Sequence, residues 1–191
     1  MLLYDNGFSH VADGFLPVLL NLMEKDGQEL VKLKSLYAIS SIVRDYPAGT
    51  KAFLDLSGAD SLLRTLQSTS NPRLRAKACF FVAVVASEDD QAKAVFCQMG
   101  FARQLVAMLQ FEEWDLSLHE QAARGLHTLL VANPAVQRDL VDSAELSFRT
   151  LVDKKISELE SKGEAQDERD FFLAIKNMCF EQGSSPECPN R

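Results

Sequence analysis

An eleven-residue block occurs three times in this chain, at residues 33–43, 76–86 and 120–130, and the three copies align without gaps. Successive copies begin 43 and 44 residues apart. A period in the low forties with helical patterning is typical of armadillo and HEAT repeats. The block therefore predicts an all-α, armadillo- or HEAT-like superhelical solenoid of about three repeats. Since a solenoid works through an extended surface, we expect a binding protein rather than a catalyst.

Each repeat is expected to contain three helices, the second of which is opened by Gly14, Gly58 or Gly100. A glycine there permits a sharp turn between two short helices. The third helices carry the repeated block, and the spacing of their apolar residues predicts which side chains face the core. These core residues are Leu36, Ile39, Val43, Cys79, Val82, Ala86, Ala123, Leu126 and Leu130.

The repeat pattern covers residues 14–143 and changes on either side. Residues 1–13 show no first helix before Gly14, so we expect an irregular N-terminal segment, as in a shortened form of a longer solenoid. Residues 144–181 carry two longer amphipathic stripes, which predict capping helices over the open end of the stack. Residues 182–191 contain Gly, Ser and Pro without periodicity and are expected to form a disordered tail.

Composition limits the partners and the compartment. The 191 residues carry a formal net charge of −7, whereas a nucleic-acid-binding domain is usually basic. Apolar runs are shorter than the roughly 18 residues that a membrane span needs, so we expect neither a nucleic acid nor a membrane as partner. The first residues lack the basic and apolar regions of a signal peptide. We expect a monomeric cytoplasmic protein.

Cysteine and histidine spacing gives no sign of a metal site, a cofactor or catalysis. Cys79, Cys97, Cys179 and Cys188 form no CxxC or Cys/His cluster, and we expect them to be reduced, as is usual in the cytosol. The chain has three histidines and no glycine-rich phosphate-binding motif. We therefore expect no catalytic residues, no cofactor and no enzyme activity.

The third helices are expected to line the concave side of the solenoid, where a partner would bind. Residues four apart on a helix point the same way, so each third helix should offer one small outward patch to the partner. Arg73 begins the second of these helices and adds to their basic character. The predicted partner-binding residues are Lys34, Tyr37, Ser41, Arg73, Lys77, Phe80, Val84, Gln121, Arg124 and Thr128.

Tyr37, Phe80 and Arg124 form the middle of this ladder, and aromatic and Arg side chains are enriched at interface hot spots. The surrounding lysines and arginines give these helices a basic character within an acidic protein, which could steer an acidic partner. An alternative stays open at this point: the aromatic rings could be partly buried between layers, with the bases forming an ordinary solvated face.

The chain resembles the armadillo-fold nucleotide exchange factors of the 70-kDa heat-shock chaperones, the family of cytosolic chaperone-binding proteins. The resemblance rests on residues 34–40 with Val43 and Arg44, on residues 96–100 with 104–107, and on His119 with Glu120. It extends weakly to residues 177–180 and covers roughly residues 14–180. The ladder differs from that of nuclear-import adaptors, in which the corresponding residues are Trp and Asn.

The resemblance implies a cochaperone without catalytic chemistry. Family members hold the second lobe of the chaperone's nucleotide-binding domain in their concave face and distort or displace the first lobe, so that ADP leaves faster. The segments that precede these repeats in family members are missing here, which implies a shortened form with reduced activity. The alternative is a generic armadillo scaffold that joins two other proteins. An enzyme of unexpected type has almost no support in the sequence.

Overall fold

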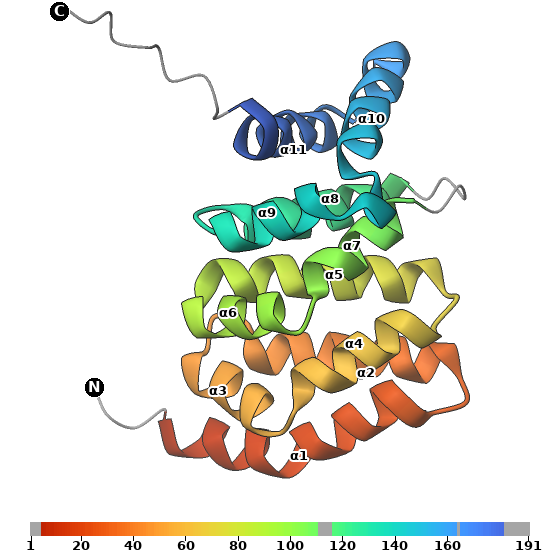
Figure 1. The fold of residues 1–191 in the computed structure, drawn as a ribbon. Helices are drawn as coiled ribbons and strands as arrows, with labels where there is room; N and C mark the ends of the chain where they lie inside the picture. Colours follow the sequence, from red (N-terminus) through yellow and green to blue (C-terminus); the bar gives the residue numbers. More distant parts are fainter. Residues whose placement is uncertain (1–4, 111–115, 164, 182–191) are drawn as a thin grey trace, which may run out of the picture.

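The computed structural model describes residues 5–110, 116–163 and 165–181 (Figure 1). No strand occurs among these residues, and the predicted all-α fold class is confirmed. The helices are α1 (Asp5–Lys25), α2 (Glu29–Val43), α3 (Pro47–Asp55), α4 (Gly58–Ser68), α5 (Pro72–Glu88), α6 (Asp90–Gln98), α7 (Phe101–Leu109), α8 (Leu116–Leu130), α9 (Pro134–Asp142), α10 (Phe148–Lys162) and α11 (Gln166–Lys176).

The helices stack on one another from α1 at the bottom of the view to α10 and α11 at the top (Figure 1). Helices α2, α5 and α8 follow one another along one side of the stack, and α5 packs against both α2 and α8. Helices α3, α4, α6, α7 and α9 cover the other side, which we call the outer layer (Figure 1). The three copies of the repeated sequence block therefore lie in α2, α5 and α8, on one side of the stack.

Local sequence signals explain where several helices begin. The Asn71 side chain accepts hydrogen bonds from the backbone N–H groups of Arg73 and Leu74 at 3.0 and 3.3 Å, and Pro72 occupies the first turn of α5. Asn133 plays the same part before α9, where Pro134 follows it. A side-chain acceptor combined with a first-turn proline satisfies the free N–H groups of a helix start and fixes its entry direction.

Two of the three predicted second helices begin at a glycine, Gly58 or Gly100, and of these two only Gly100 has a positive φ. Gly100 has φ +81° and immediately precedes α7. Before α4 the left-handed residue is Ser57, and Gly58 is required for space, because a Cβ there would collide with the Phe53 ring. Gly14 lies inside α1 and opens no helix.

The expectation of an irregular segment at residues 1–13 is wrong for residues 5–13, which belong to α1. Gly14 and Pro17 both lie inside this helix. They weaken local helix propensity, but the second half of α1 is fixed by packing of Leu16, Leu20 and Met23 into the core. Residues 1–4 and the predicted tail at 182–191 lie outside the described residues.

The core follows the predicted stripes of the third helices. All nine predicted core residues are buried, and the apolar contacts continue from α1 to α11 as one cluster. Phe81 packs edge-on against Phe53 with ring centroids 5.3 Å apart, joining α5 to α3. Burial of apolar area of this kind is the main force that holds the stacked layers together.

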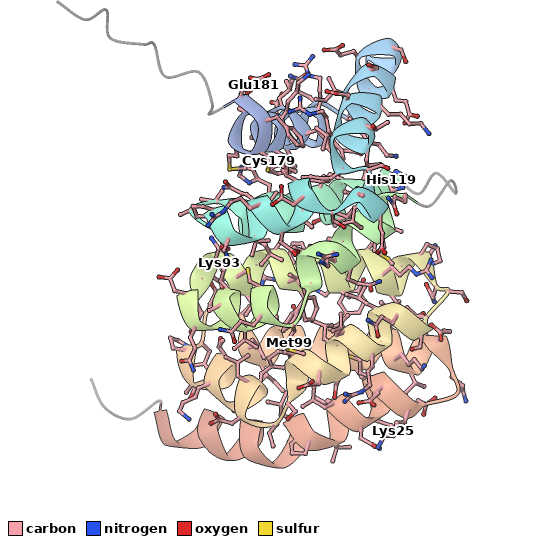
Figure 2. All side chains as sticks on the ribbon, in the orientation of Figure 1. Lys25, Lys93, Met99, His119, Cys179 and Glu181 are labelled. Atoms are coloured by element: carbon pink, nitrogen blue, oxygen red, sulfur yellow. The ribbon has the colours of Figure 1, made fainter. Side chains whose placement is uncertain are left out.

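In the C-terminal part, α10 and α11 pack on each other, and α11 also packs against α8. A short 3-10 helix (Ala144–Leu146) precedes α10, and a π-helix (Asn177–Glu181) follows α11. Lys155 of α10 contacts His119 of α8, with Lys155 Nζ 3.4 Å from His119 Nδ1. Both side chains are buried, as is that of Glu168 in α11. Figure 2 shows His119 where α8 meets α10. The interpretation of this segment as a cap, and the division of the chain at residues 14, 143 and 181, stay predictions.

No helix in the described part of the chain is long and apolar enough to cross a membrane.

Candidate functional site

A groove of about 280 Å³ crosses the exposed side of α2, α5 and α8. Each of the three helices contributes to it, because their outward positions lie three or four residues apart and so share one face. The lining residues are Tyr37 from α2, Arg73, Ala76, Lys77 and Phe80 from α5, and Ser117 and Gln121 from α8. We call this the central groove.

Lys77 lies at the centre of the groove. Its Nζ is 5.0 Å from the centroid of the Tyr37 ring and 4.6 Å from that of Phe80, and it donates a hydrogen bond to Ser40 Oγ at 3.1 Å. The negative faces of two aromatic rings attract an ammonium group at this distance. The side chain is therefore held in place by α2 and its own helix before any partner arrives.

Three further cations surround the two rings. The guanidinium carbons of Arg44 and Arg124 lie 5.3 and 5.7 Å from the Phe80 centroid, and Lys34 Nζ lies 5.9 Å from that of Tyr37. Together with Arg73 and Lys77 they form a set that we call the groove cations: Lys34, Arg44, Arg73, Lys77 and Arg124. The groove and its border thus combine two aromatic rings with five positive charges, of which Arg73 and Lys77 line the groove itself.

Burial and repulsion both act on Lys77. Partial burial lowers the pKa of its ammonium group, and the positive charge of Arg44 lowers it further. A carboxylate beside Lys77 would oppose both effects, because an opposite charge favours the ionised form. The groove is therefore arranged at some electrostatic cost to the folded protein.

Among the described residues, no groove cation forms an ion pair with a carboxylate. Two acidic side chains nearby are otherwise engaged: Glu120 accepts from Gln121 Nε2, and Glu88 accepts from the backbone N–H of Asp45. Arg44 Nε and Gln121 Oε1 are buried and make no hydrogen bond to the described protein. Buried polar atoms without partners are uncommon and mark places where a ligand, water or partner group supplies the bond.

A second depression, of about 400 Å³, lies beside the central groove between α1 and α2. Its lining is mostly apolar and consists of Leu19, Leu22, Leu30, Val31, Lys34 and Ser35. Leu30 is 63% exposed, which is unusual for a large aliphatic side chain. Lys34 belongs to this depression and also lies over the Tyr37 ring, so the two hollows adjoin.

The structure brings most of the predicted binding residues together. Tyr37, Arg73, Lys77, Phe80 and Gln121 line the central groove. Lys34 and Arg124 border it through their contacts with the two rings. Both rings are partly packed, as in the alternative interpretation. Tyr37 is 47% exposed, and Phe80 is half-buried.

Three of the predicted partner-binding residues offer less to a partner than expected. Val84 is only 7% exposed and does not fit the expectation of a partner-facing residue, because it lies on the buried side of α5. The hydroxyl groups of Ser41 and Thr128 each donate to the carbonyl four residues earlier, of Tyr37 and Arg124, at 3.0 Å. These hydroxyl donors are therefore already used within their own helices.

Sequence reasoning missed Arg44 and Ser117. Arg44 follows the last residue of α2 and lies seven residues after Tyr37, a spacing that puts both on one helix face. That spacing was the available signal. Ser117 lies in the first turn of α8, next to residues outside the described part of the chain, and nothing in its local sequence distinguishes it.

His127 is packed rather than placed in the groove. Its ring lies 5.5 Å from the Phe171 ring of α11, and burial together with the charge of Lys93 lowers its pKa. Among the described residues, no three His, Cys, Asp or Glu side chains are grouped so that they could hold a metal ion.

Comparison with known proteins adds to this geometry. Residues 8–95 match the model of the family described as the SIL1/FES1/HPBP1 C-terminal domain. Over 173 residues the chain is 31% identical to the Hsp70-binding protein 1 of Mus musculus and to that of Homo sapiens. The alignment covers 91% of this chain and 46% of each relative, so the chain spans about half the length of these curated relatives.

The fold also resembles a solved structure of an engineered protein from the Northeast Structural Genomics Consortium. The two share a TM-score of 0.73 over 91% of this chain and 66% of that one. At 20% sequence identity, this likeness shows the fold alone.

Proposed function

We propose that this chain, whose residues 8–95 match the model of the SIL1/FES1/HPBP1 C-terminal domain, is a cochaperone that binds the nucleotide-binding domain of 70-kDa heat-shock chaperones. The central groove is the contact surface in this proposal. Binding there promotes ADP release, with no covalent step. A generic armadillo scaffold, the alternative from sequence, would share the fold and lack this partner.

The observation that carries the proposal is the ladder of aromatic and cationic side chains over three successive helices. Tyr37, Lys77, Phe80 and Arg124 come from three helices, α2, α5 and α8, and cation–aromatic contacts link them in a row. Aromatic and Arg side chains with ordered geometry supply much of the energy at protein interfaces. The apolar depression beside them extends the same surface toward α1.

Conformational linkage supplies the mechanism. If the chain binds the nucleotide-free chaperone domain more tightly than the ADP-bound one, it shifts the chaperone population toward the state that has lost ADP. Linkage is reciprocal, so ADP must weaken binding of this chain by the same factor by which the chain weakens binding of ADP. Excess ADP should therefore reduce the affinity of the complex.

The proposal extends to compartment and assembly. Cys79, Cys97 and Cys179 are free, which supports a cytosolic location, where thiols stay reduced. We also propose that the chain acts as a monomer, because the groove is complete within one chain.

The test combines pull-down of the purified chaperone domain with release of a fluorescent ADP analogue from it. Wild type is expected to bind and to accelerate release, and Tyr37→Glu with Phe80→Glu is expected to abolish both. Val141→Glu is the matched control, since Val141 is an exposed apolar residue of α9 in the outer layer. Absence of both binding and acceleration in wild type would refute the proposal. Binding that survives the double substitution in a folded protein would refute the groove as its site.

A further inference from the structure

Within the described part of the chain, the groove cations lack a carboxylate partner, whereas most of the other positive side chains there have one. Elsewhere in the described chain, ion pairs join cations of α2, α3, α4, α7, α10 and α11 to acidic residues. The chain has 27 acidic and 20 basic residues, so carboxylates are in excess. Five cations that have no carboxylate partner within the described part of an acidic protein therefore require a physical explanation.

Internal packing does not provide that explanation. The positive charge of Arg44 and the partial burial of the site both lower the pKa of Lys77, so the folded chain holds this ammonium group at a cost. Attraction to the Tyr37 and Phe80 rings offsets part of it. Replacement of these cations by neutral side chains would remove the repulsion without opening the core. Their arrangement favours binding over stability.

From this arrangement we infer that the central groove receives a carboxylate-bearing ridge of a folded protein, with an Asp or Glu side chain seated among Arg73, Lys77 and Arg124. The inference rests on the proposed function and names the chemistry of the chaperone surface that the groove contacts. Arg forks and a preoriented ammonium suit a carboxylate, which can accept several charge-assisted hydrogen bonds at once. The aromatic rings then pack on the stem of the inserted side chain.

Size and charge favour a protein over a small anion or a nucleic acid. The groove, at about 280 Å³, is slightly below the range of about 300–1,000 Å³ that is usual for small-molecule sites, and it continues into an apolar depression. A polyanionic strand would meet a chain with net charge −7 beyond the groove, which opposes long-range association. A compact acidic ridge flanked by apolar residues matches both hollows.

The inference is tested by the salt dependence of binding to the purified chaperone nucleotide-binding domain. Charge contacts are screened by salt, so the affinity of wild type should fall about tenfold between about 50 and about 400 mM salt. Arg73→Gln, Lys77→Met and Arg124→Gln should each weaken binding about fivefold to tenfold at low salt and flatten the salt dependence. Lys154→Met on α10, an exposed lysine away from the groove, is the matched control.

Arg73→Gln keeps the test informative if the other variants fold poorly, because Arg73 is exposed in the first turn of α5. Binding that is equally strong at both salt concentrations and in all three variants would overturn the inference and leave the proposed function standing. If wild type fails to bind the chaperone domain, the proposed function fails, and poly-L-glutamate becomes the probe. Binding of poly-L-glutamate that Arg73→Gln weakens would then support the carboxylate site, whereas no binding, or tighter groove-dependent binding of a single-stranded oligonucleotide, would overturn it.

Discussion

Arginines on the two sides of the helix stack have different surroundings. In the outer layer, Arg64 of α4 donates to both carboxylate oxygens of Glu24 in α1, at 2.8 and 3.1 Å. Arg103 of α7 donates in the same way to Asp139 of α9, at 2.9 and 2.6 Å. At the border of the central groove, Arg124 and Arg44 lie over the Phe80 ring and pair with no carboxylate of the described chain. The outer charges join α4 to α1 and α7 to α9, whereas the groove charges contact aromatic rings and, in our proposal, a partner.

Neighbouring aromatic residues of α5 show the same division. Phe81 is completely buried and packs on Phe53, whereas Phe80 lies in the groove among cations. One step along a helix turns a side chain by about 100°. Two adjacent residues of one type therefore serve the fold and the surface separately, and substitutions can test each role alone.

The largest effect is expected from Phe81→Ala. Removal of a fully buried phenyl ring leaves a cavity and should reduce the free energy of unfolding by about 3–5 kcal/mol. Phe80→Ala should cost about 1 kcal/mol, since it removes cation–aromatic contacts at a partly exposed site. Urea denaturation followed by circular dichroism measures both. An equal or greater loss for Phe80→Ala would contradict the division of α5 into two faces.

A carboxylate introduced into the groove should form ion pairs with the groove cations and so replace the partner's carboxylate. Gln121 lines the groove from α8, the helix that also carries Arg124. Gln121→Glu therefore places an acidic side chain near Arg124 and opposite Arg73 and Lys77 of α5. We expect a higher unfolding temperature and about tenfold weaker binding of the chaperone domain. Gln98→Glu on α6, an exposed position of the outer layer, is the control and should change neither. A variant that binds more tightly would show that the groove faces positive charge.

The pH dependence of stability should reveal the cost of Lys77. Its pKa in the folded chain is below the ordinary value of 10.5, so between these two pKa values the unfolded chain binds more protons and stability rises with pH. Relative to Lys77→Met, wild type should therefore gain stability as the pH rises from neutral toward 10.5. Parallel urea titrations of both proteins over this range measure the difference. A constant difference would mean that Lys77 is not destabilised by its surroundings.

The smallest effect is expected at acidic pH in the outer layer. The hydrogen bond from Arg64 lowers the pKa of Glu24 below its ordinary value of 4.5. The pair therefore contributes stability above that pH, and this contribution is lost as the pH falls through the folded-state pKa. Arg64→Met should be slightly less stable than wild type at neutral pH and equal to it in acid. Thermal unfolding of both proteins at matched pH values measures the difference. A difference in stability that persists in acid would contradict the prediction.

Much of the groove was predictable because its residues recur with the repeat. Tyr37 and Phe80 are 43 residues apart, and helical spacing put Lys77 and Arg124 on the same side as these rings. The prediction that Val84 faces a partner was wrong, because the buried face of α5 is wider than that of a simple amphipathic helix. Residues 81–86 are all buried. The neighbours on both sides of a helix decide such burial, and the helix's own sequence does not contain them.

By itself the sequence determined the all-α repeat, the core stripes and most of the groove residues, since helical periodicity is a local property that survives in any stacked arrangement. Only the tertiary structure decided that residues 5–13 continue into α1, that Ser57 rather than Gly58 takes the left-handed turn, and that Arg44 joins the groove. It also decided which cations have carboxylate partners. Those outcomes depend on distances between layers, and pairs such as Arg64 with Glu24 lie 40 residues apart in the chain.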